Sequence, residues 1–206
     1  MNTRRQDMPI ISVILLVINA VVFFYQEATG DTESTMFLLE HGAMYLPSVI
    51  EQGEWYRVIT HIFMHSGIEH LLCNMIMLVA LGKYMEAVYG RINFIITYFL
   101  CGLGATFISA LPQMLVEDYH VSVGASGAIM GLFGAYLVML FKEGRVRGYN
   151  SAARLILLFI VMVFGNMEQG VDWMAHFGGA AFGVVIAFIL YKPQGNNIYL
   201  GGDSNG

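Results

Sequence analysis

Long apolar stretches alternate with short polar segments along the chain. Most of the apolar stretches approach the ~20 residues that a helix needs to cross a hydrocarbon core of ~30 Å. This pattern predicts an all-α membrane protein with six spanning helices. The fifth span is the shortest, and its 14 residues would rise only about 21 Å as a helix. The predicted spans are Pro9–Glu27, His70–Tyr89, Ile92–Leu111, Ser126–Phe141, Ala152–Gly165 and Trp173–Tyr191.

Composition agrees with a membrane protein. Hydrophobic residues make up 57% of the 206 residues and charged residues 12%, whereas soluble domains carry about 25% charged residues. Cys73 and Cys101 both lie inside predicted spans, so we expect packing cysteines rather than a disulfide or a metal site.

The basic residues set the orientation, because nearly all of them flank one side of the predicted spans. Arg57 alone falls on the other side. Lys and Arg favour the cytoplasmic side of a membrane protein, so we expect both termini in the cytoplasm. The basic residues on that side are Arg4, Arg5, Lys83, Arg91, Lys142, Arg145, Arg147, Arg154 and Lys192.

The connection between the first two spans is unusually long. It runs over about 40 residues, 28–69, where helices of a bundle are usually joined by about two to eight. Apolar and aromatic side chains alternate with polar ones in Met36–Leu39, Met44–Pro47 and Glu54–Phe63. Such a segment is typical of one that lies in the membrane interface, so we predict a long interfacial loop.

Three polar side chains occur at one predicted depth in the membrane. Ser126 and His176 each stand 16 residues before a lysine, Lys142 and Lys192, that follows an aromatic residue. At 1.5 Å per residue, both groups would lie about 24 Å from the cytoplasmic boundary. Asn74 on the second span has a matching depth. Polar groups inside spans generally mark function, so we predict a recessed polar site.

Small residues on the fourth and sixth spans predict close packing of these two helices. Gly127 and Gly131 repeat with a four-residue spacing, as do Gly179 and Gly183. Small residues at this spacing let membrane helices approach backbone to backbone. We therefore expect the serine of the fourth span to reach the histidine of the sixth.

This pair suits acyl transfer, since a serine hydroxyl becomes a good nucleophile when a neutral imidazole takes its proton. Asn74 and His70 lie four residues apart on one helix face, and together with the N–H of Ser126 they could stabilise an oxyanion. Asp172 could orient His176, but we expect it to face the outer water and favour a dyad. A helix N-cap is the alternative reading of Ser126.

These residues resemble the rhomboid family of intramembrane serine proteases. The matching motifs are "WYR" at Trp55–Arg57, His65, His70 and Asn74 within "HSGIEHLLCN", "GASG" at Gly124–Gly127, and "AHFGGAAFG" at Ala175–Gly183. The resemblance implies that Ser126 is the nucleophile and His176 the general base, and that His70 and Asn74 help to form the oxyanion hole. Met130 departs from the family, some members of which place an aromatic residue there to stack on the histidine. The supporting residues would be Trp55, Arg57, His65, Glu86, Gly124, Gly127, Gly179 and Gly183.

The resemblance also implies a six-helix rhomboid bundle over residues 1–193, followed by a polar tail at 194–206. Such a protein hydrolyses peptide bonds in or near transmembrane segments of other membrane proteins. We expect partners limited to these substrates and the lipid bilayer, with no nucleic acid, metal or cofactor. We further expect a bacterial-type inner cell membrane, with the site opening to the outer side.

Three alternatives remain open. A non-catalytic rhomboid-like protein that binds and escorts membrane helices is the main one, although such relatives typically lack the serine or the histidine. A zinc protease could use His61, His65, His70 and His176, but the HEXXH motif is absent from the sequence. A transporter is the third, although no inverted repeat is evident.

Overall fold

The computed structural model describes residues 8–143, 160 and 172–192. Within these ranges the chain forms helices and no strand, apart from an isolated bridge between Met44 and Ser122. Four helices are long and apolar enough to cross a membrane, and a fifth apolar helix, α7, is slightly shorter. The long helices are α1 (Ile10–Thr29), α5 (Gly67–Val88), α6 (Arg91–Val116), α7 (Ser126–Glu143) and α9 (Trp173–Leu190).

These five helices match five of the six predicted spans. The remaining prediction, Ala152–Gly165, lies outside the described residues, so the number of spans stays a prediction. The largest difference in boundaries is in α6, which continues past Pro112 to Val116. The predicted span ended at Leu111, directly before Pro112, a residue type that usually ends or kinks a helix. With 26 residues, α6 rises about 39 Å, more than a hydrocarbon core of about 30 Å requires.

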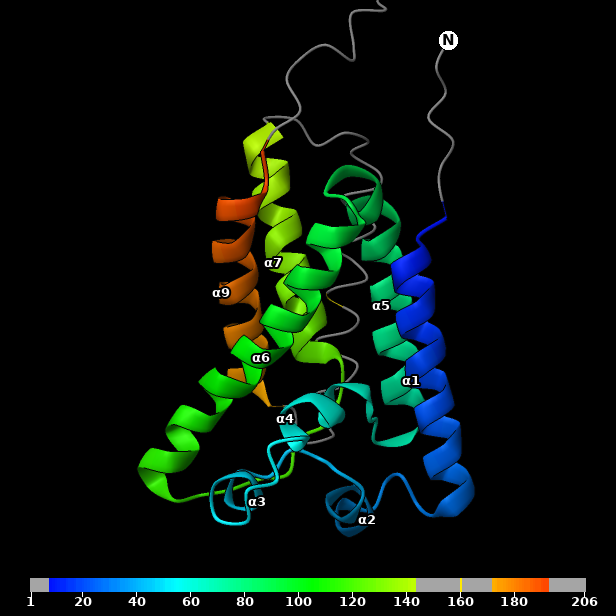
Figure 1. The fold of residues 1–206 in the computed structure, drawn as a ribbon, viewed down its shortest axis with the longest axis vertical. Coiled ribbons are helices and arrows are strands. Elements are labelled where there is room, and N and C mark those ends of the chain that lie inside the picture. Colours follow the sequence, from blue (N-terminus) through cyan, green and yellow to red (C-terminus); the bar gives the residue numbers. More distant parts are fainter. Residues whose placement is uncertain (1–7, 144–159, 161–171, 193–206) are drawn as a thin grey trace, which may run out of the picture.

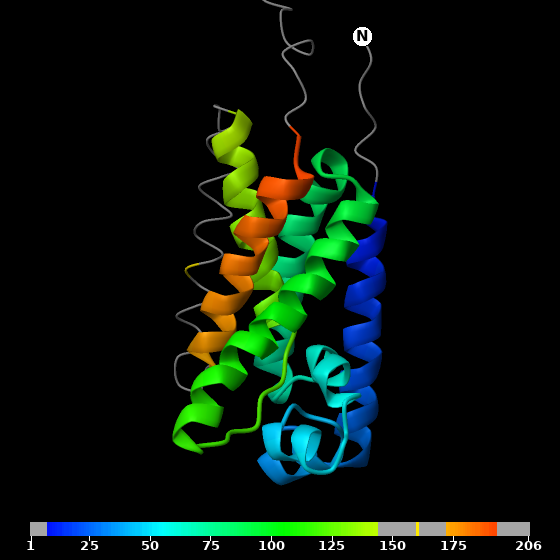
Figure 2. The ribbon, with the colours of Figure 1, turned by 60° about the vertical axis from the view of Figure 1, so that its left-hand side comes forward.

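The helices form two groups that run along the long axis of the molecule. α6, α7 and α9 pack against one another, and α1 lies beside α5 (Figure 1). Turning the molecule shows α6 inclined across α9 with its far end projecting from the bundle (Figure 2). We call the end where α1 begins and α9 ends the terminus end, and the opposite end the loop end.

The long connection between α1 and α5 folds into short helices at the loop end (Figure 1). Arg57, which is buried, joins their turns. Its Nη1 donates hydrogen bonds to the carbonyl oxygens of Leu39 at 2.7 Å and Ala43 at 2.8 Å, and its Nε pairs with Glu54. The connection therefore has a fixed shape. Its helices are α2 (Thr35–Glu40), α3 (Leu46–Ile50), α4 (Arg57–Thr60) and a 3-10 turn at His61–Phe63.

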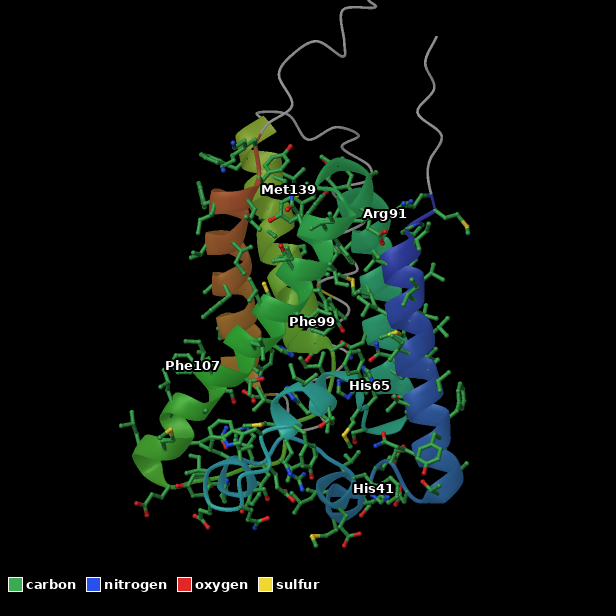
Figure 3. The ribbon with its side chains drawn as sticks, in the orientation of Figure 1. His41, His65, Arg91, Phe99, Phe107 and Met139 are labelled. Carbon is green, nitrogen blue, oxygen red and sulfur yellow. The ribbon has the colours of Figure 1, made fainter. Side chains whose placement is uncertain are left out.

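The same connection is bonded to the segment that leads into α7. Met44 and Ser122 exchange backbone hydrogen bonds of 3.0 and 2.9 Å, and the N–H of Gly124 donates to the carbonyl of His61 at 2.9 Å. Nitrogen and oxygen atoms of side chains gather at this loop end, whereas the side chain of Phe107 points away from the bundle (Figure 3). The polar groups of the fold are thus concentrated where α7 begins.

α7 and α9 are in backbone contact along their length, as the spacing of their small residues predicts. A Cβ added to Gly179 would overlap the carbonyl oxygen of Gly127, and one added to Gly183 would overlap that of Gly131. On its other side Gly131 faces the fully buried side chain of Cys101 in α6. Glycine at these positions is therefore required by the close approach of three helices.

α1 is held to α5 differently, by polar side chains. The carboxylate of Glu86 accepts hydrogen bonds from the N–H groups of Ile11 at 3.0 Å and Ser12 at 2.7 Å, and from the Ser12 hydroxyl at 2.6 Å. It thereby pairs N–H groups that a helix start leaves without partners. Glu86, predicted as a supporting residue, thus binds the start of the neighbouring helix.

Candidate active site

The hydroxyl of Ser126 and the ring of His176 lie in direct contact. His176 Nε2 is 2.9 Å from Ser126 Oγ, although 50 residues separate them in sequence. Ser126 is the first residue of α7, and His176 lies in the first turn of α9 and is 6% exposed. The contact predicted from matched depth and small-residue packing is therefore present in the structure.

The backbone before Ser126 requires glycine. Gly124 has a φ of +117°, a conformation that is uncommon for residues with a Cβ. A Cβ at this position would also lie 2.8 Å from the ring of His70. The "GASG" motif thus turns the chain into α7 while leaving room for a histidine from α5.

The two predicted oxyanion residues occupy different surroundings. His70 borders the cavity at Ser126, and its Nδ1 accepts a hydrogen bond of 3.4 Å from the N–H of Ser66. Asn74 is fully buried, and its amide donates to the carbonyl of His70 at 2.9 Å within the same helix. Both side chains belong to one face of α5, but the Asn74 amide is directed along its own helix.

A cavity of about 160 Å³ opens over the serine and the histidine. Its lining combines backbone of the "GASG" segment, apolar groups such as Ile62, and polar side chains of α6, namely Thr106, Ser109 and Gln113. The described residues contain no group of three or more His, Cys, Asp or Glu placed to hold a metal ion. The cavity therefore presents a paired hydroxyl and imidazole in partly polar surroundings.

Comparison with known proteins shows the family to which the chain belongs. The sequence model of the Rhomboid domain matches residues 52–193. The chain belongs to the rhomboid family. This match includes every residue of the proposed site, from the long connection to the end of α9.

Individual relatives of this rhomboid come from plants and bacteria. It is 34% identical over 166 residues to RHOMBOID-like protein 1 of Arabidopsis thaliana, covering 78% of this chain and 41% of the relative. It is 30% identical over 187 residues to the rhomboid protease GluP of Bacillus subtilis, with coverages of 90% and 36%. The rhomboid protease AarA of Providencia stuartii is 30% identical over 210 residues, with coverages of 87% and 73%.

The chain thus spans less than half of the first two relatives. Family membership and the apolar helices establish an integral membrane protein of a family that includes named proteases.

The other predicted supporting residues lie around the long connection of the rhomboid. His65 is fully buried, with its ring 5.1 Å from that of His70 in an edge-to-face contact. Burial, together with the neighbouring His70, holds the pKa of His65 well below its usual value, so its ring is neutral at pH 7. Trp55 is 66% exposed, a placement that suits a ring at a membrane interface. A role for Trp55 stays a prediction.

His61, predicted only as a possible metal ligand, also contributes to the cavity wall. Its Nδ1 donates to the carbonyl of Arg57 at 2.8 Å, and its Nε2 lies 3.1 Å from the Thr106 hydroxyl. Burial lowers the pKa of His61 to about 4. A neutral imidazole therefore connects the 3-10 turn to α6 beside Ser126 and His176.

Asp172 and Trp173, which both precede His176, have contacts that the sequence did not indicate. Trp173 places its ring edge-to-face with His176 at 5.8 Å, so the histidine has an aromatic neighbour although position 130 is methionine. Asp172 was expected to face the outer water, but its side chain is only 10% exposed. Its carboxylate contacts Ser109 and His120 rather than the ring of His176.

Proposed function

We propose that this rhomboid is an intramembrane serine endopeptidase that uses a dyad of Ser126 and His176. The observation that carries the proposal is the 2.9 Å contact between His176 Nε2 and Ser126 Oγ. When His176 is neutral, a proton on Nδ1 leaves Nε2 free to accept the serine proton. Nδ1 is buried and has no hydrogen-bond partner among the described residues, which supports a dyad rather than a triad.

The reaction proceeds through an acyl-enzyme. Ser126 Oγ attacks the scissile carbonyl carbon while His176 Nε2 takes the hydroxyl proton. The tetrahedral intermediate collapses, the C–N bond breaks, and His176 gives its proton to the departing amine. A water molecule then attacks the ester carbonyl, with His176 again accepting and returning a proton, so that the acid product and the free serine are released.

Donors for the oxyanion are available next to the serine. The N–H of Ser126 lies in the first turn of α7, where N–H groups have no acceptor within the helix. The ring of His70 borders the same cavity. Asn74 could donate if its amide turned from the carbonyl of His70 toward the substrate. Each such donor typically contributes ~10²–10³ in rate.

The substrates we propose are transmembrane segments of other proteins. A membrane helix has its backbone groups paired internally, which hides the scissile carbonyl. Gly or Pro near the cleavage position weakens this pairing, and a small residue before the scissile bond suits a site walled by glycine backbone.

The proposed architecture is a six-helix rhomboid bundle of residues 1–193 in a lipid bilayer, with a tail at 194–206. The bias of Lys and Arg puts both termini in the cytoplasm, so that the loop end, and with it the site, faces the outer side. A bacterial-type inner cell membrane is the proposed location.

Cleavage of a single-span model substrate in liposomes tests the proposal. We expect the native protein to cleave, Ser126→Ala to be inactive, and Asn74→Ala to retain its thermal stability but to cleave ~10²-fold more slowly, as expected for loss of one oxyanion donor. Equal cleavage by the native protein and Ser126→Ala would overturn the serine mechanism, and inhibition by a chelator would then indicate a metal enzyme. If the folded native protein leaves a panel of such substrates uncut but binds them, the escort function replaces the protease.

A further inference from the structure

Asp172 is the centre of a polar cluster at the loop end. Its Oδ2 accepts a 2.5 Å hydrogen bond from the Ser109 hydroxyl and a 3.2 Å hydrogen bond from His120 Nε2. Its Oδ1 accepts the N–H of Ala175 at 2.8 Å, which makes Asp172 the N-cap of α9. Both carboxylate oxygens are therefore occupied by donors other than His176.

Gln113 closes the cluster into a ring of hydrogen bonds. Its Nε2 donates to the Ser109 hydroxyl at 3.2 Å, and its Oε1 accepts the backbone N–H of His120 at 3.2 Å. The ring of four residues thus runs Gln113–Ser109–Asp172–His120 and returns to Gln113. Ring members polarise one another and restrict one another's positions.

The ring joins three parts of the fold that meet at the proposed site. Ser109 and Gln113 belong to α6, His120 belongs to the segment that leads to Ser126, and Asp172 starts the helix that carries His176. The backbone N–H of His176 donates to the carbonyl of Asp172 at 3.1 Å. A shift of Asp172 would therefore move the first turn of α9, including the imidazole of His176.

We propose that Asp172 is a positioning residue, and that its contact with His120 and Ser109 holds the start of α9 where His176 meets Ser126. The inference rests on the proposed protease function. It assigns to the carboxylate a role through the helix, since no described contact joins it to the imidazole. The hydrogen bond from His120 is the part of this interaction that depends on charge, because the imidazole gains a proton at low pH.

The charged surroundings make the pairing of His120 with Asp172 dependent on pH. The hydrogen bond that His120 donates to Asp172 raises the pKa of His120, against the effect of partial burial, and Asp118 raises it further. Burial acts to raise the pKa of Asp172, but hydrogen bonds from His120, Ser109 and Ala175 outweigh it and lower that pKa. Among the described residues, the other titratable groups that interact with Asp172 are His61 and His176, and the two ring members from α6, Ser109 and Gln113, are uncharged.

The direction of the pH effect follows from these shifts. Because the pKa of His120 is higher in the folded protein, its pairing with Asp172 is complete below about pH 6.5, the ordinary histidine value. The pairing weakens as the pH rises through the raised pKa. Proteolysis should therefore decline on the alkaline side, in addition to the acid decline expected because His176 must be neutral to act as a base.

The test compares native protein, Asp172→Asn and His120→Gln between pH 5 and 9, with kcat and KM measured separately in liposomes. Asn keeps a capping oxygen but loses the charge, and we expect kcat to fall about tenfold, equivalent to about 1.4 kcal/mol, with KM unchanged. His120→Gln should abolish the alkaline decline. Glu51→Gln, which removes an exposed charge from the same end of the molecule, is the matched control and should behave as native protein.

Hydrogen exchange of the amides of residues 172–177, corrected for intrinsic rates, provides a readout independent of proteolysis. We expect faster exchange in Asp172→Asn at every pH, and in His120→Gln at the lower pH values, where native His120 is charged. Native exchange together with native kcat and pH profile would reduce Asp172 to an ordinary helix cap and overturn the proposal. The native protein could leave every substrate uncut while the exchange of the two variants changes as expected. In that case the proposed protease function fails, and the role of Asp172 in fixing the start of α9 stands.

Discussion

α1 and α9 are apolar helices of similar length, 20 and 18 residues, that are fixed to the bundle by different means. α9 lies with glycine Cα atoms against the backbone of α7, at Gly179 and again at Gly183. α1 is anchored at its start by the carboxylate of Glu86 and presents a buried stripe that includes Leu15 and Phe23 toward the bundle.

The difference follows from what each helix carries. A backbone contact leaves little freedom in distance or register, because neither partner has a side chain that can change rotamer. The helix that carries the proposed base His176 needs such accuracy, since a displacement of about 1 Å can cost ~10² in rate. α1 contributes no described residue to the cavity, so polar anchoring and side-chain packing are sufficient for it.

Adding one methyl group between α7 and α9 should have the largest effect. In Gly183→Ala the new Cβ meets the carbonyl of Gly131, which belongs to the backbone and cannot rotate away. We expect a stability loss of about 2–3 kcal/mol, at the upper end for overpacking, and a fall in kcat of at least tenfold, about 1.4 kcal/mol.

The control for this variant is Val185→Ile, which adds one carbon to the same helix at an exposed position. It should leave the thermal unfolding temperature in detergent and the kcat unchanged. If Gly183→Ala kept native kcat, accurate backbone contact would not be what places His176.

Removing the anchor of α1 should separate stability from catalysis. Glu86→Ala leaves the partly buried N–H of Ile11 and the buried N–H of Ser12 without this acceptor, and loss of a buried hydrogen-bond partner costs about 1–3 kcal/mol. We therefore expect a clearly lower unfolding temperature, with the kcat of the folded fraction within about threefold of native, well short of the tenfold that 1.4 kcal/mol would give.

Glu86→Gln, which retains an acceptor oxygen, should recover most of that stability. A loss of kcat in Glu86→Ala as large as in Gly183→Ala would show that α1 also determines the geometry of the site, and the contrast between the two helices would disappear.

The smallest effect is expected at the terminus end of α9. Lys142 of α7 donates from Nζ to the carbonyls of Phe188 at 2.9 Å and Tyr191 at 3.0 Å, pairing groups that the helix end leaves free. A cation at a helix C-terminus contributes about 0.3–1 kcal/mol, so Lys142→Met should lower stability by about that amount. The kcat should change less than twofold, and Lys142→Arg should match native protein in both measurements.

Much of the site could be predicted because its signals are local or periodic. Span lengths placed Ser126 and His176 at one depth, and four-residue spacing of glycines indicated which two helices touch. Those features depend on helix geometry, which is nearly the same in every protein. The contact between serine and histidine followed from them without knowledge of the rest of the chain.

Contacts between irregular segments had no comparable signal. The bond between Asp172 and His120 joins residues 52 positions apart, and His120 lies in a segment without periodicity. A polar residue directly before an apolar helix does indicate an N-cap, and this could have predicted the hydrogen bond that the N–H of Ala175 donates to Asp172. The predicted span ended at Leu111, so the end of α6 beyond Pro112 was missed; a proline inside a helix usually ends or kinks it.

The two cysteines give the bundle a chemical reporter. Cys101 is fully buried where α6 faces Gly131, while Cys73 on α5 is partly accessible. A membrane-permeant alkylating reagent can therefore modify Cys73 in the folded protein but reaches Cys101 only when α6 separates from α7. The rate of the second modification, read as a mass increment, measures how often the packing behind Ser126 opens.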